Sequence, residues 1–557
     1  MTSNSLVSIA NPESRASKTQ QILTHFRKTD TEEIEEIIGK SNSKTCDLDP
    51  LPTVIFKMFV KQLSVPLTLI INKSLSCGEV PTSFKTAIVT PVLKKSHLDP
   101  NEVSNYRPIS NLQFTSKVLE KVVFKRLDEH FEKNHLMSDN QSAYRRNHST
   151  ETLLIKISND ILTALNHGKS TLLVTLDISA AFDTVNRQML LQRYESDFGI
   201  SDGALDWVAS YLTDRQQKVR VGSAYSSLSY VDSGFPQGSV LGGFKYNAFT
   251  SPLDALIRQH NVEDQCYADD SNLYVSFAVK DEGETQASLS NLTDCLDHVK
   301  KWMIENRLLL NSTKTEAILF QSPLRVRQAG PHNVSLDFDG HSLSFSSHIE
   351  SLGVILDDKM KMERQVNATT KIAYFYLRKI KRVRNRLTQD ITETLVNALI
   401  TSRLDYCNAL LCHLPNKTLC KLQKVQNAAA KLIMQASRRS HVTPLLRHLH
   451  WLPISYRCQF KVLMLTYKIL SNTAPVYLRN LISEYSPSRS LRSADQKFLK
   501  RTGIPKNSFG QRSFSNIAPV LWNGLPAAVR KAKSLKEFKS KLKTHFFVEH
   551  YGSDPSL

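Results

Sequence analysis

The sequence predicts an α+β protein made of several structural units, and three observations lead to this fold class. First, β-prone runs alternate with patterns of helical spacing between residues 86 and 320. Second, beyond residue 351 the chain changes to long, basic helical patterns, which indicate a separate helical unit. Third, prolines divide residues 441–557 into short elements, which suits a mixed, mainly helical C-terminal unit. A chain of 557 residues is also too long for one hydrophobic core.

The composition points to a polyanionic partner. The chain carries 72 Lys and Arg residues against 52 Asp and Glu, and its net charge of +20 favours nucleic acid. No apolar run approaches the roughly 20 residues that a membrane-spanning helix needs. The polar N-terminus lacks the features of a signal peptide, and eight scattered cysteines suit reduced thiols. We therefore expect a nucleic-acid-binding protein of the nucleus and cytoplasm, with no membrane partner.

Hydrophobic periodicity and capping residues place the elements of the first third. Apolar positions at helical spacing predict helices, whereas a short apolar run bounded by lysines predicts a strand. The polar stretch 141–150 is loop-like, and Ser149 or Thr150 at its end can cap the next helix. In order, the sequence predicts helices over 31–38, 54–63 and 118–127, with a strand over 86–93 before the last of them.

The middle of the chain contains the β-prone run that ends on Asp177. The glycines and proline of residues 234–243 mark a backbone held open. In order, the sequence predicts a strand over 170–176, a helix over 185–198, a hairpin of 216–221 with 228–231, helices over 249–257 and 289–302, and a turn at 311–315 that enters a strand.

Two adjacent carboxylates, Asp269 and Asp270, interrupt a short apolar segment. Neighbouring side chains on extended backbone point to opposite faces, so a tight hairpin here aims at least one of them into a cleft. A solvated Asp-Asp turn is the simpler alternative. Asp177 supplies a third carboxylate at a strand end, although alone it could equally cap a helix. Three such acids can hold two Mg²⁺ ions about 3.5–4 Å apart for in-line phosphoryl transfer.

Six sequence blocks occur in a specific order and spacing. They are Asn-Tyr-Arg-Pro-Ile-Ser at 105–110, Gln-x-x-Tyr-Arg with His-Ser-Thr at 141–150, Asp-x-x-x-Ala-Phe-Asp at 177–183, Gly-Phe-Pro-Gln-Gly-Ser-Val-Leu-Gly at 234–242, Tyr-Ala-Asp-Asp at 267–270 and Leu-x-Leu-Asn-x-x-Lys-Thr-Glu at 308–316. Together they resemble the reverse transcriptases of non-long-terminal-repeat, LINE-type retrotransposons. Segments 402–408, 450–454 and 518–523 look like the tail of Jockey-like elements, and they argue against an intron maturase or a telomerase-like enzyme.

The resemblance implies a right-hand polymerase fold with fingers, a palm containing an antiparallel sheet, and a helical thumb. The units that it implies are an N-terminal extension at 1–84, partly disordered and then helical, fingers and palm at 85–345, a thumb at 346–440, and a C-terminal domain of unknown fold at 441–557. It also implies an RNA-directed DNA polymerase that extends a DNA primer on an RNA template with deoxynucleoside triphosphates and two Mg²⁺ or Mn²⁺ ions.

Complete elements of this type carry an endonuclease ahead of the polymerase. Only about 85 residues precede the fingers-like region, fewer than a typical domain of that kind needs. We therefore expect no endonuclease domain here, and we consider a separately encoded endonuclease or RNA-binding protein as a partner.

Catalytic roles are carried over by resemblance, position by position. Asp177, Asp269 and Asp270 match the catalytic, metal-binding acids, and the Ile178 carbonyl matches a further ligand. The residues that match nucleotide-binding positions are Arg145, Phe182, Gln237, Gly238 and Lys314.

Each nucleotide-binding position has a physical role and a simpler alternative. The guanidinium of Arg145 suits a triphosphate, and Lys314 matches the lysine proposed to protonate departing pyrophosphate, although both could be ordinary surface residues. Phe182 matches the ring that excludes a ribose 2′-hydroxyl, with core packing as the alternative. Gln237 and Gly238 match the loop along the incoming nucleotide. Arg107 ranks below Arg145 as a phosphate contact.

The basic run at 378–386 is expected to follow the nucleic-acid backbone, with a solvated helix face as the alternative. Its candidate contacts are Arg378, Lys379, Lys381 and Arg382. A second basic stretch, 529–543, leaves RNA binding, nuclear import and solubility open. Cys407, Cys412, His413 and Cys420 lie close together, but their spacing favours buried thiols over a zinc site.

Several positions depart from the family pattern. Gly242-Gly243 stands where Gly-Pro is usual, and Lys245 could bring an unpaired charge to a packed helix face. Ala143-Tyr144 stands where Gly-Phe is commoner. These changes raise a second hypothesis, a decayed or co-opted copy that binds nucleic acid without polymerising.

Overall fold

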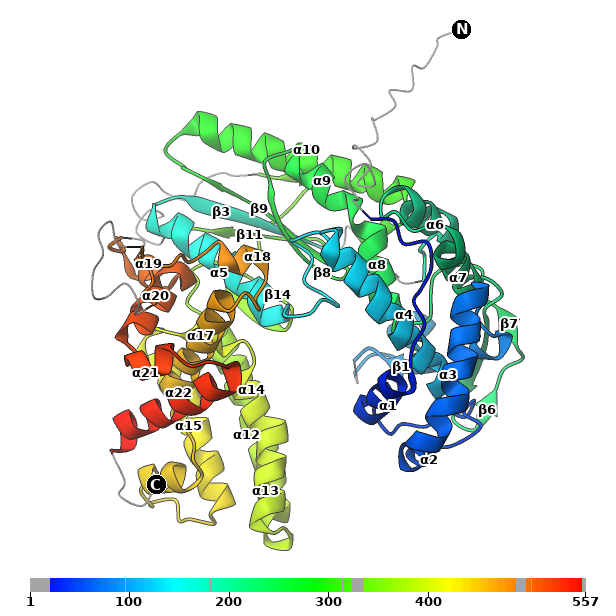
Figure 1. Cartoon of the computed structure of the whole chain (residues 1–557). Coiled ribbons are helices and arrows are strands. Elements are labelled where there is room, and N and C mark those ends of the chain that lie inside the picture. Colours follow the sequence, from blue (N-terminus) through cyan, green and yellow to red (C-terminus); the bar gives the residue numbers. More distant parts are fainter. Residues whose placement is uncertain are drawn as a thin grey trace.

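The computed structural model describes residues 21–95, 97–179, 183–311, 314–322, 335–486, 497–501 and 503–552. In these residues, helices surround two main sheets (Figure 1), which confirms the predicted α+β class. We name the two sheets after the units predicted above: the palm sheet is four-stranded and antiparallel, in the order β11-β3-β9-β8. The fingers sheet is five-stranded and belongs to the N-terminal half of the chain.

The palm sheet consists of β3 (Ser170–Leu176), β8 (Glu263–Tyr267), β9 (Asp270–Phe277) and β11 (Glu316–Phe320). Side chains alternate between its faces, so Leu172 and Val174 of β3 enter one hydrophobic core while Leu173 enters another. Both faces are covered, which explains why β3 is a continuous apolar run rather than an alternating one.

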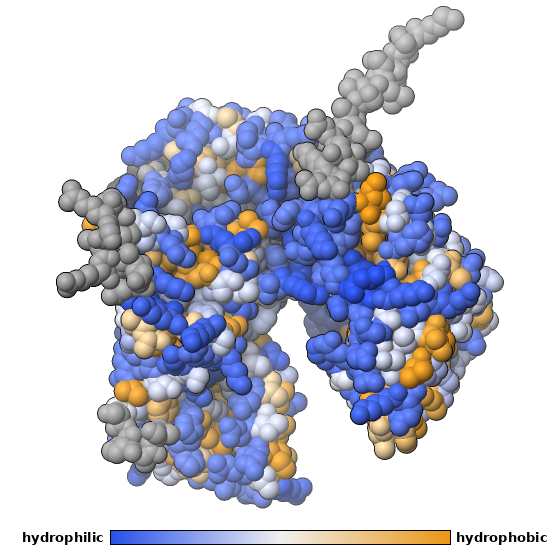
Figure 2. Space-filling model, viewed as in Figure 1, coloured by the Kyte–Doolittle hydropathy of each residue, from blue (hydrophilic) through white to orange (hydrophobic). Residues whose placement is uncertain are grey.

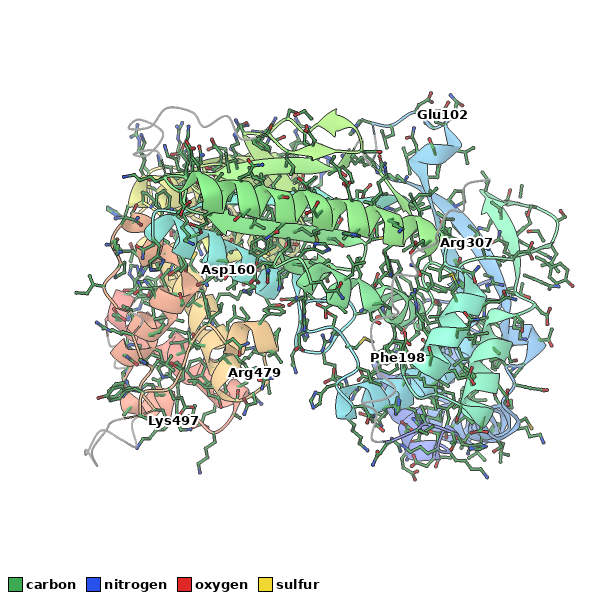
Figure 3. The ribbon with its side chains drawn as sticks, turned by 90° about the horizontal axis from the view of Figure 1, so that it is seen from above. Glu102, Asp160, Phe198, Arg307, Arg479 and Lys497 are labelled. Atoms are coloured by element: carbon green, nitrogen blue, oxygen red, sulfur yellow. The ribbon has the colours of Figure 1, made fainter. Side chains whose placement is uncertain are left out.

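Two helices of the palm contribute to these two cores. Residues of α10 (Glu282–Glu305) share a core with Leu172, and residues of α5 (Thr150–Asn166) share the other with Leu173. Figure 3, seen from above, shows α10 running along the sheet. Ser149 caps α5 as predicted, since its hydroxyl accepts from the Thr152 amide in a capping box.

The fingers sheet contains β1 (Thr86–Leu93), β2 (Tyr106–Leu112), β5 (Gln216–Val221), β6 (Ala224–Tyr225) and β7 (Ser229–Tyr230). The predicted strand over 86–93 and the hairpin from 216 are confirmed. The helices of this half are α2 (Thr53–Met58), α3 (Val60–Cys77), α4 (Phe114–Lys133), α6 (Arg187–Ser196), α7 (Asp202–Leu212), α8 (Gly242–Thr250) and α9 (Pro252–Arg258).

Two predicted helices are each divided in the structure. The helix expected over 54–63 breaks at Phe59, between α2 and α3. The helix expected over 249–257 breaks at Ser251, because Pro252 begins a new helix, and α8 starts earlier than predicted, at Gly242.

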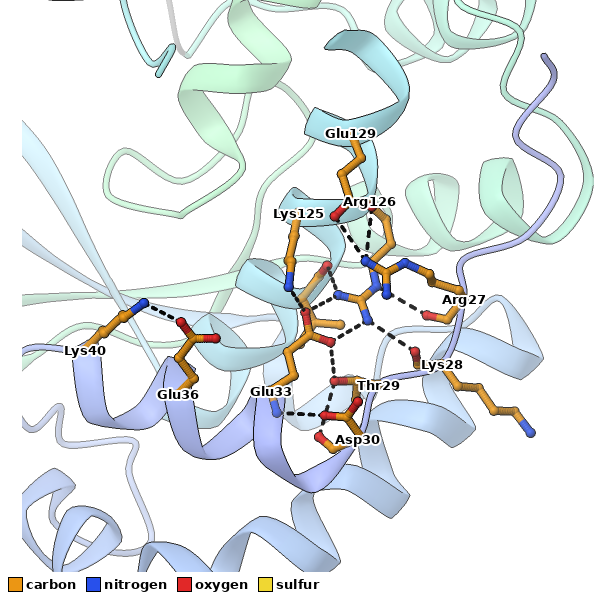
Figure 4. A network of polar contacts seen from close by, with 11 residues as sticks. Arg27, Lys28, Thr29, Asp30, Glu33, Glu36, Lys40, Lys125, Arg126 and Glu129 are labelled. Carbon is orange, nitrogen blue, oxygen red and sulfur yellow. Dashed lines mark hydrogen bonds and ion pairs between the residues drawn. The ribbon is translucent and has the colours of Figure 1, made fainter. Parts of the chain in front are cut away.

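The N-terminal helix α1 (Thr31–Lys40) is attached to α4 by a polar network (Figure 4). The guanidinium of Arg126, which is 2% exposed, donates to both carboxylate oxygens of Glu33 at 2.7 and 2.6 Å. Burial alone would raise the pKa of Glu33, but the hydrogen bonds from Arg126, Thr29 and Lys125 lower it to about 2. Helix α1 is therefore held against α4 by a buried ion pair.

After the palm, a hairpin of β14 (His348–Ser351) and β15 (Val354–Asp357) leads into the helical half. Its first helices are α12 (Glu363–Val383), α13 (Gln389–Val396), α14 (Ser402–Asp405) and α15 (Asn416–Ile433). The C-terminal helices are α16 (Thr443–His448), α17 (Ile454–Leu470), α18 (Val476–Arg479), α19 (Ser508–Arg512), α20 (Phe514–Gly524), α21 (Ala527–Arg530) and α22 (Leu535–Tyr551). The predicted helical character is confirmed. None of the helices in the described residues is both long and apolar enough to cross a bilayer.

The hydrophobic core of this helical half includes α5 of the palm. Leu153, Ile157 and Ile161 of α5 belong to the same buried cluster as Leu463 of α17 and Trp522 of α20. The unit boundaries given above remain predictions, but this shared core joins the palm to the C-terminal helices.

A wide opening separates the two halves below the palm (Figure 2). In Figure 1, α12 and α13 border it on one side and α1 and α4 on the other, with β8 above it. The palm sheet therefore lies beside a gap large enough to be seen in the space-filling view.

Candidate active site

The Asp269–Asp270 pair lies at the tip of the hairpin between β8 and β9. Tyr267 pairs with Asp270, so only Ala268 and Asp269 form the loop, and Ala268 has a positive φ of 57°. On the neighbouring strand, Leu176 pairs with Ser271. Asp177 therefore follows the end of β3 directly beside Asp270, as the sequence predicts for acids on adjacent strands.

The pKa values of Asp269 and Asp270 are raised in this cluster of three carboxylates. Burial raises the pKa of Asp269, as does the charge of Asp177, and the charges of Arg107 and Lys314 oppose these effects. Burial and the charges of Asp269 and Asp177 raise the pKa of Asp270 to about 6. Lys314 forms an ion pair with Asp177 at 2.8 Å. The site thus concentrates negative charge that these two cations neutralise incompletely.

This charge distribution suits a divalent cation. Carboxylate oxygens are the ligands that Mg²⁺ and Mn²⁺ prefer, and a cation beside mutually repelling acids would favour their ionised forms. In the described residues, no group of three His, Cys, Asp or Glu side chains converges closely enough to form a ligand cluster. Lys314 instead donates a hydrogen bond to one carboxylate oxygen of Asp177. Ile178 begins the short strand β4 (Ile178–Ser179), which pairs with β10 (Leu309–Leu310).

Gln141 holds the tip of the hairpin in place. Its side-chain oxygen accepts from the Ala268 amide at 2.9 Å, and its side-chain nitrogen donates to the Ala268 carbonyl at 3.3 Å. The amide of Ser142 donates to the carbonyl of Cys266, and the amide of Cys266 donates to the carbonyl of Asn140, both at 2.9 Å. Residues 140–142 thus extend the palm sheet beyond β8. Sequence reasoning missed this role, although Gln141 opens one of the six blocks.

The loop containing Gln237 and Gly238 is fixed to strand β2. The Ser110 amide donates to the Gln237 carbonyl at 2.7 Å. Gly238 has a φ of 114°, and a Cβ there would lie 2.8 Å from the Ser110 carbonyl oxygen, so both conformation and space require glycine. The Gln237 amide donates to Asp183 at 3.0 and 3.2 Å, beside a cavity of about 310 Å³ that Arg215 also lines.

The structure does not bring Arg145 to the carboxylates. Its guanidinium donates to the carbonyls of Ser138 and Gln141 and is 11% exposed. Arg107, on the exposed side of β2, instead acts electrostatically on Asp269. Lys314 and Arg107 are therefore the cations at the acids. Phe182 lies outside the described residues.

Comparisons with known proteins agree with this geometry. Residues 92–356, which contain all four strands of the palm sheet and all three acids, match the family described as reverse transcriptase (RNA-dependent DNA polymerase). This stretch is a reverse transcriptase domain. The chain is 27% identical to the probable RNA-directed DNA polymerase from transposon BS of Drosophila melanogaster over 63% of its own length. It is 26% identical to the RNA-directed DNA polymerase from mobile element jockey of Drosophila funebris over 67% of its length.

The chain spans only 39–40% of the length of these two relatives. Among solved structures, it is similar to apo telomerase from Candida tropicalis truncated from the C-terminal domain, at 12% identity and a TM-score of 0.32. That similarity covers 50% of this chain and 54% of the telomerase chain.

Two departures from the family pattern meet in the reverse transcriptase domain. A Cβ at Gly243 would lie 2.3 Å from Cγ of the Tyr144 ring. The ring of Tyr144 therefore occupies the space that any side chain at position 243 would need. The unusual residues at 144 and 243 fit each other.

Lys245 of the reverse transcriptase domain is fully buried, which agrees with the predicted placement of its charge on a packed helix face. Its Nζ lies 3.3 Å from the centroid of the Tyr211 ring, and it has no hydrogen-bond partner among the described residues. Burial lowers its pKa well below the usual value, which the nearby charge of Glu120 opposes. Glu120 in turn accepts from the amides of Val240 and Leu241, at the start of α8.

The predicted nucleic-acid contacts after the reverse transcriptase domain lie on α12. Arg378, Lys379, Lys381 and Arg382 are all exposed. Lys379 lies over the ring of Phe375, 4.6 Å from its centroid, and Phe375 is itself 46% exposed. In Figure 1, α12 borders the opening below the palm, and these exposed cations and the ring of Phe375 give the helix a basic and aromatic surface.

Cys407 and Cys412 of the cysteine cluster are buried thiols, whereas Cys420 is exposed. Cys407 and Cys412 are 4% and 2% exposed, and burial raises the pKa of each to about 12. Thiols with such pKa values stay protonated, which disfavours metal binding.

Proposed function

We propose that the protein is an RNA-directed DNA polymerase that extends a DNA primer on an RNA template by two-metal nucleotidyl transfer. The observation that carries the proposal is the meeting of Asp177, Asp269 and Asp270 at the tip of the palm sheet, within a reverse transcriptase domain. Two cations, Arg107 and Lys314, act electrostatically on Asp269, and positive charge beside the acids suits a triphosphate substrate.

The geometry supports a division of labour among these residues. Asp177 and Asp269 would hold the metal ions, with Asp270 as a weaker ligand because it starts the strand that leads away. Bound ions would activate the primer 3′-hydroxyl and neutralise the leaving pyrophosphate. The new bond joins the 3′-oxygen to the α-phosphorus, and the bond from this phosphorus to the β-phosphate bridging oxygen breaks.

Lys314 has two tasks in this proposal. In the structure it pairs with Asp177, and once the carboxylate binds an ion, its ammonium is free to move to the triphosphate. There it is placed to give a proton to the departing pyrophosphate. Arg107 would hold the outer phosphate oxygens, a role for which its free, exposed position suits it better than Arg145.

The test is extension of a DNA primer on an RNA template. We expect Asp269→Asn to lower the rate at least a hundredfold, because one carboxylate ligand is lost while the side-chain volume is kept. Asp297→Asn, on the exposed side of α10, is the matched control and should leave extension unchanged. Removal of divalent ions by a chelator should stop the wild-type reaction, and activity retained by Asp269→Asn would refute the proposal.

A second candidate function is nucleic-acid binding without polymerisation, as in a decayed or co-opted copy of the element. It rests on the buried Lys245 and on Arg145, whose guanidinium is bonded to loop carbonyls away from the carboxylates. Salt-sensitive binding of template and primer, with no incorporation in either Mg²⁺ or Mn²⁺, would favour it.

A further inference from the structure

We propose that the C-terminal domain positions the catalytic hairpin through a single side chain, Tyr477. This inference rests on the proposed function, since it assigns a role in polymerisation to a domain that lies outside the reverse transcriptase match. Tyr477 belongs to α18, and it is separated by 335 residues from Ser142, its partner in the palm.

The contact consists of three buried hydroxyl groups. The Tyr477 hydroxyl lies 2.9 Å from Ser142 Oγ and 2.9 Å from Thr152 Oγ1. Ser142, Thr152 and Tyr477 are 1%, 3% and 4% exposed. Water therefore cannot replace a lost partner without a rearrangement.

Counting protons sets the direction of each hydrogen bond. Thr152 donates its only hydroxyl proton to the Ser149 carbonyl at 2.8 Å, so toward Tyr477 it accepts. Tyr477 therefore donates to Thr152 and accepts from Ser142. Each of the three hydroxyl protons, those of Ser142, Tyr477 and Thr152, then has one acceptor. Removal of the Tyr477 oxygen takes away the acceptor of the Ser142 proton.

Ser142 connects this contact to the active site. Its amide donates to the carbonyl of Cys266 in β8, and the preceding residue, Gln141, holds both polar groups of the Ala268 backbone. Asp269 follows Ala268 directly. Covalent and hydrogen bonds thus run from α18 to the catalytic loop, with Ser142 and Gln141 between them.

The C-terminal domain holds Tyr477 rigidly at this point. The ring belongs to the core shared by α5 and α17, and it packs against His148 with the ring centroids 5.8 Å apart. Nearby, Lys461 of α17 pairs with Glu151 at 3.2 Å, and the Ala409 amide donates to the same carboxylate. Residues from the helical half therefore surround the start of α5, beside residues 140–142.

Tyr477→Phe in the full chain tests the proposal, with Tyr467→Phe as the matched control. Tyr467 lies in the same domain, and its hydroxyl bonds the Ala532 carbonyl at 3.1 Å, away from the palm. We expect Tyr477→Phe to speed hydrogen exchange of the amides at 266–270 roughly tenfold, as the loss of one buried hydrogen bond predicts. Single-nucleotide incorporation should slow by a similar factor, with unchanged affinity for template and primer. The control should change neither.

Ser142→Ala removes the other partner and provides a second route to the same answer. It should reproduce both effects, and the double variant should be no worse than Ser142→Ala alone, because the two residues act through one contact. Unchanged exchange in both single variants, or an equal effect of Tyr467→Phe, would overturn the proposal. Absence of incorporation by the wild type would refute the proposed function instead, and hydrogen exchange would still decide the role of Tyr477.

Discussion

At the scale of single residues, the two adjacent aspartates have different environments. Asp269 is in the loop, and burial raises its pKa, although the charges of Arg107 and Lys314 oppose the rise. Asp270 begins β9, and the causes found for its raised pKa are burial and two like charges. Within the pair, Asp270 is therefore the acid whose ionisation no neighbouring cation among the described residues is found to favour.

This difference predicts a pH-dependent stability. The folded-state pKa of Asp270 is raised from 3.8 to about 6, so its contribution to stability is greatest below pH 3.8 and is lost as the pH rises through 6. In a chelator, Asp270→Asn should unfold at higher urea than the wild type at pH 8. The gain should be at most about 1 kcal/mol, because solvent screens a partly exposed group.

The difference between Asp270→Asn and the wild type should shrink as the pH falls and vanish near pH 4. Asp297→Asn is the control for a general effect of removing a carboxylate. A stability gain of Asp270→Asn that did not depend on pH would contradict this account.

The sequence was informative for these acids and less so for their neighbours. Asp177 could be placed because it ends a β-prone run, and Asp269 because its block is short and local. The role of Gln141 depends on hydrogen bonds to a backbone 127 residues later, which no local pattern reveals. Arg145 was ranked above Arg107 by motif, but its guanidinium is bonded to two loop carbonyls.

At the scale of elements, the start of α8 shows how two departures compensate. The Tyr144 ring fills the space over Gly243, and Tyr144 itself has a positive φ of 57°. In the sequence, Tyr144 and Gly243 are two separate departures from the family pattern. Their contact could not be predicted, because about 100 residues separate them and neither belongs to a periodic pattern.

Gly243→Ala should destabilise the protein by about 1–3 kcal/mol, since the new methyl group overlaps the ring. Urea unfolding measures the change, and Tyr144→Ala in the same chain should remove most of the penalty. Gly39→Ala in α1 is the control: no atom lies within 4 Å of its Cβ position, so it should be neutral or stabilising. An unchanged stability of Gly243→Ala would mean that the ring moves aside freely.

At the scale of the whole molecule, α12 with its exposed basic side chains borders the opening between the two halves (Figure 1). The exposed side chains Lys379 and Arg382 are one turn apart on this surface. Their replacement by alanine should weaken template–primer binding and reduce the slope of log affinity against log salt by about 1.4–1.8.

The matched control replaces Lys280 and Lys301, which are exposed at α10, with alanine. The net charge of the protein changes by the same amount in both double variants. In the control, however, the slope of log affinity against log salt should stay that of the wild type. Equal slopes for the two double variants would show that α12 attracts nucleic acid only through the total charge of the protein.

The α+β class and the helical C-terminal half were predictable because periodicity and composition are local properties. The attachment of the C-terminal helices to the palm was not. α5 is buried on most of its faces although polar residues are spread among its apolar ones, and many of its partners lie far along the chain.

The position of α5 also sets the order in which the protein is completed during synthesis. The Ser515 amide donates to the side chain of Asn159, 356 residues earlier, and Asn507 bonds the carbonyl of Leu165. A ribosome releases α5 long before these partners exist, so the nascent palm carries an uncovered apolar helix for most of translation. The palm therefore reaches its final form only when the last helices emerge, and a chain interrupted during synthesis would expose the apolar side chains of α5 to chaperones.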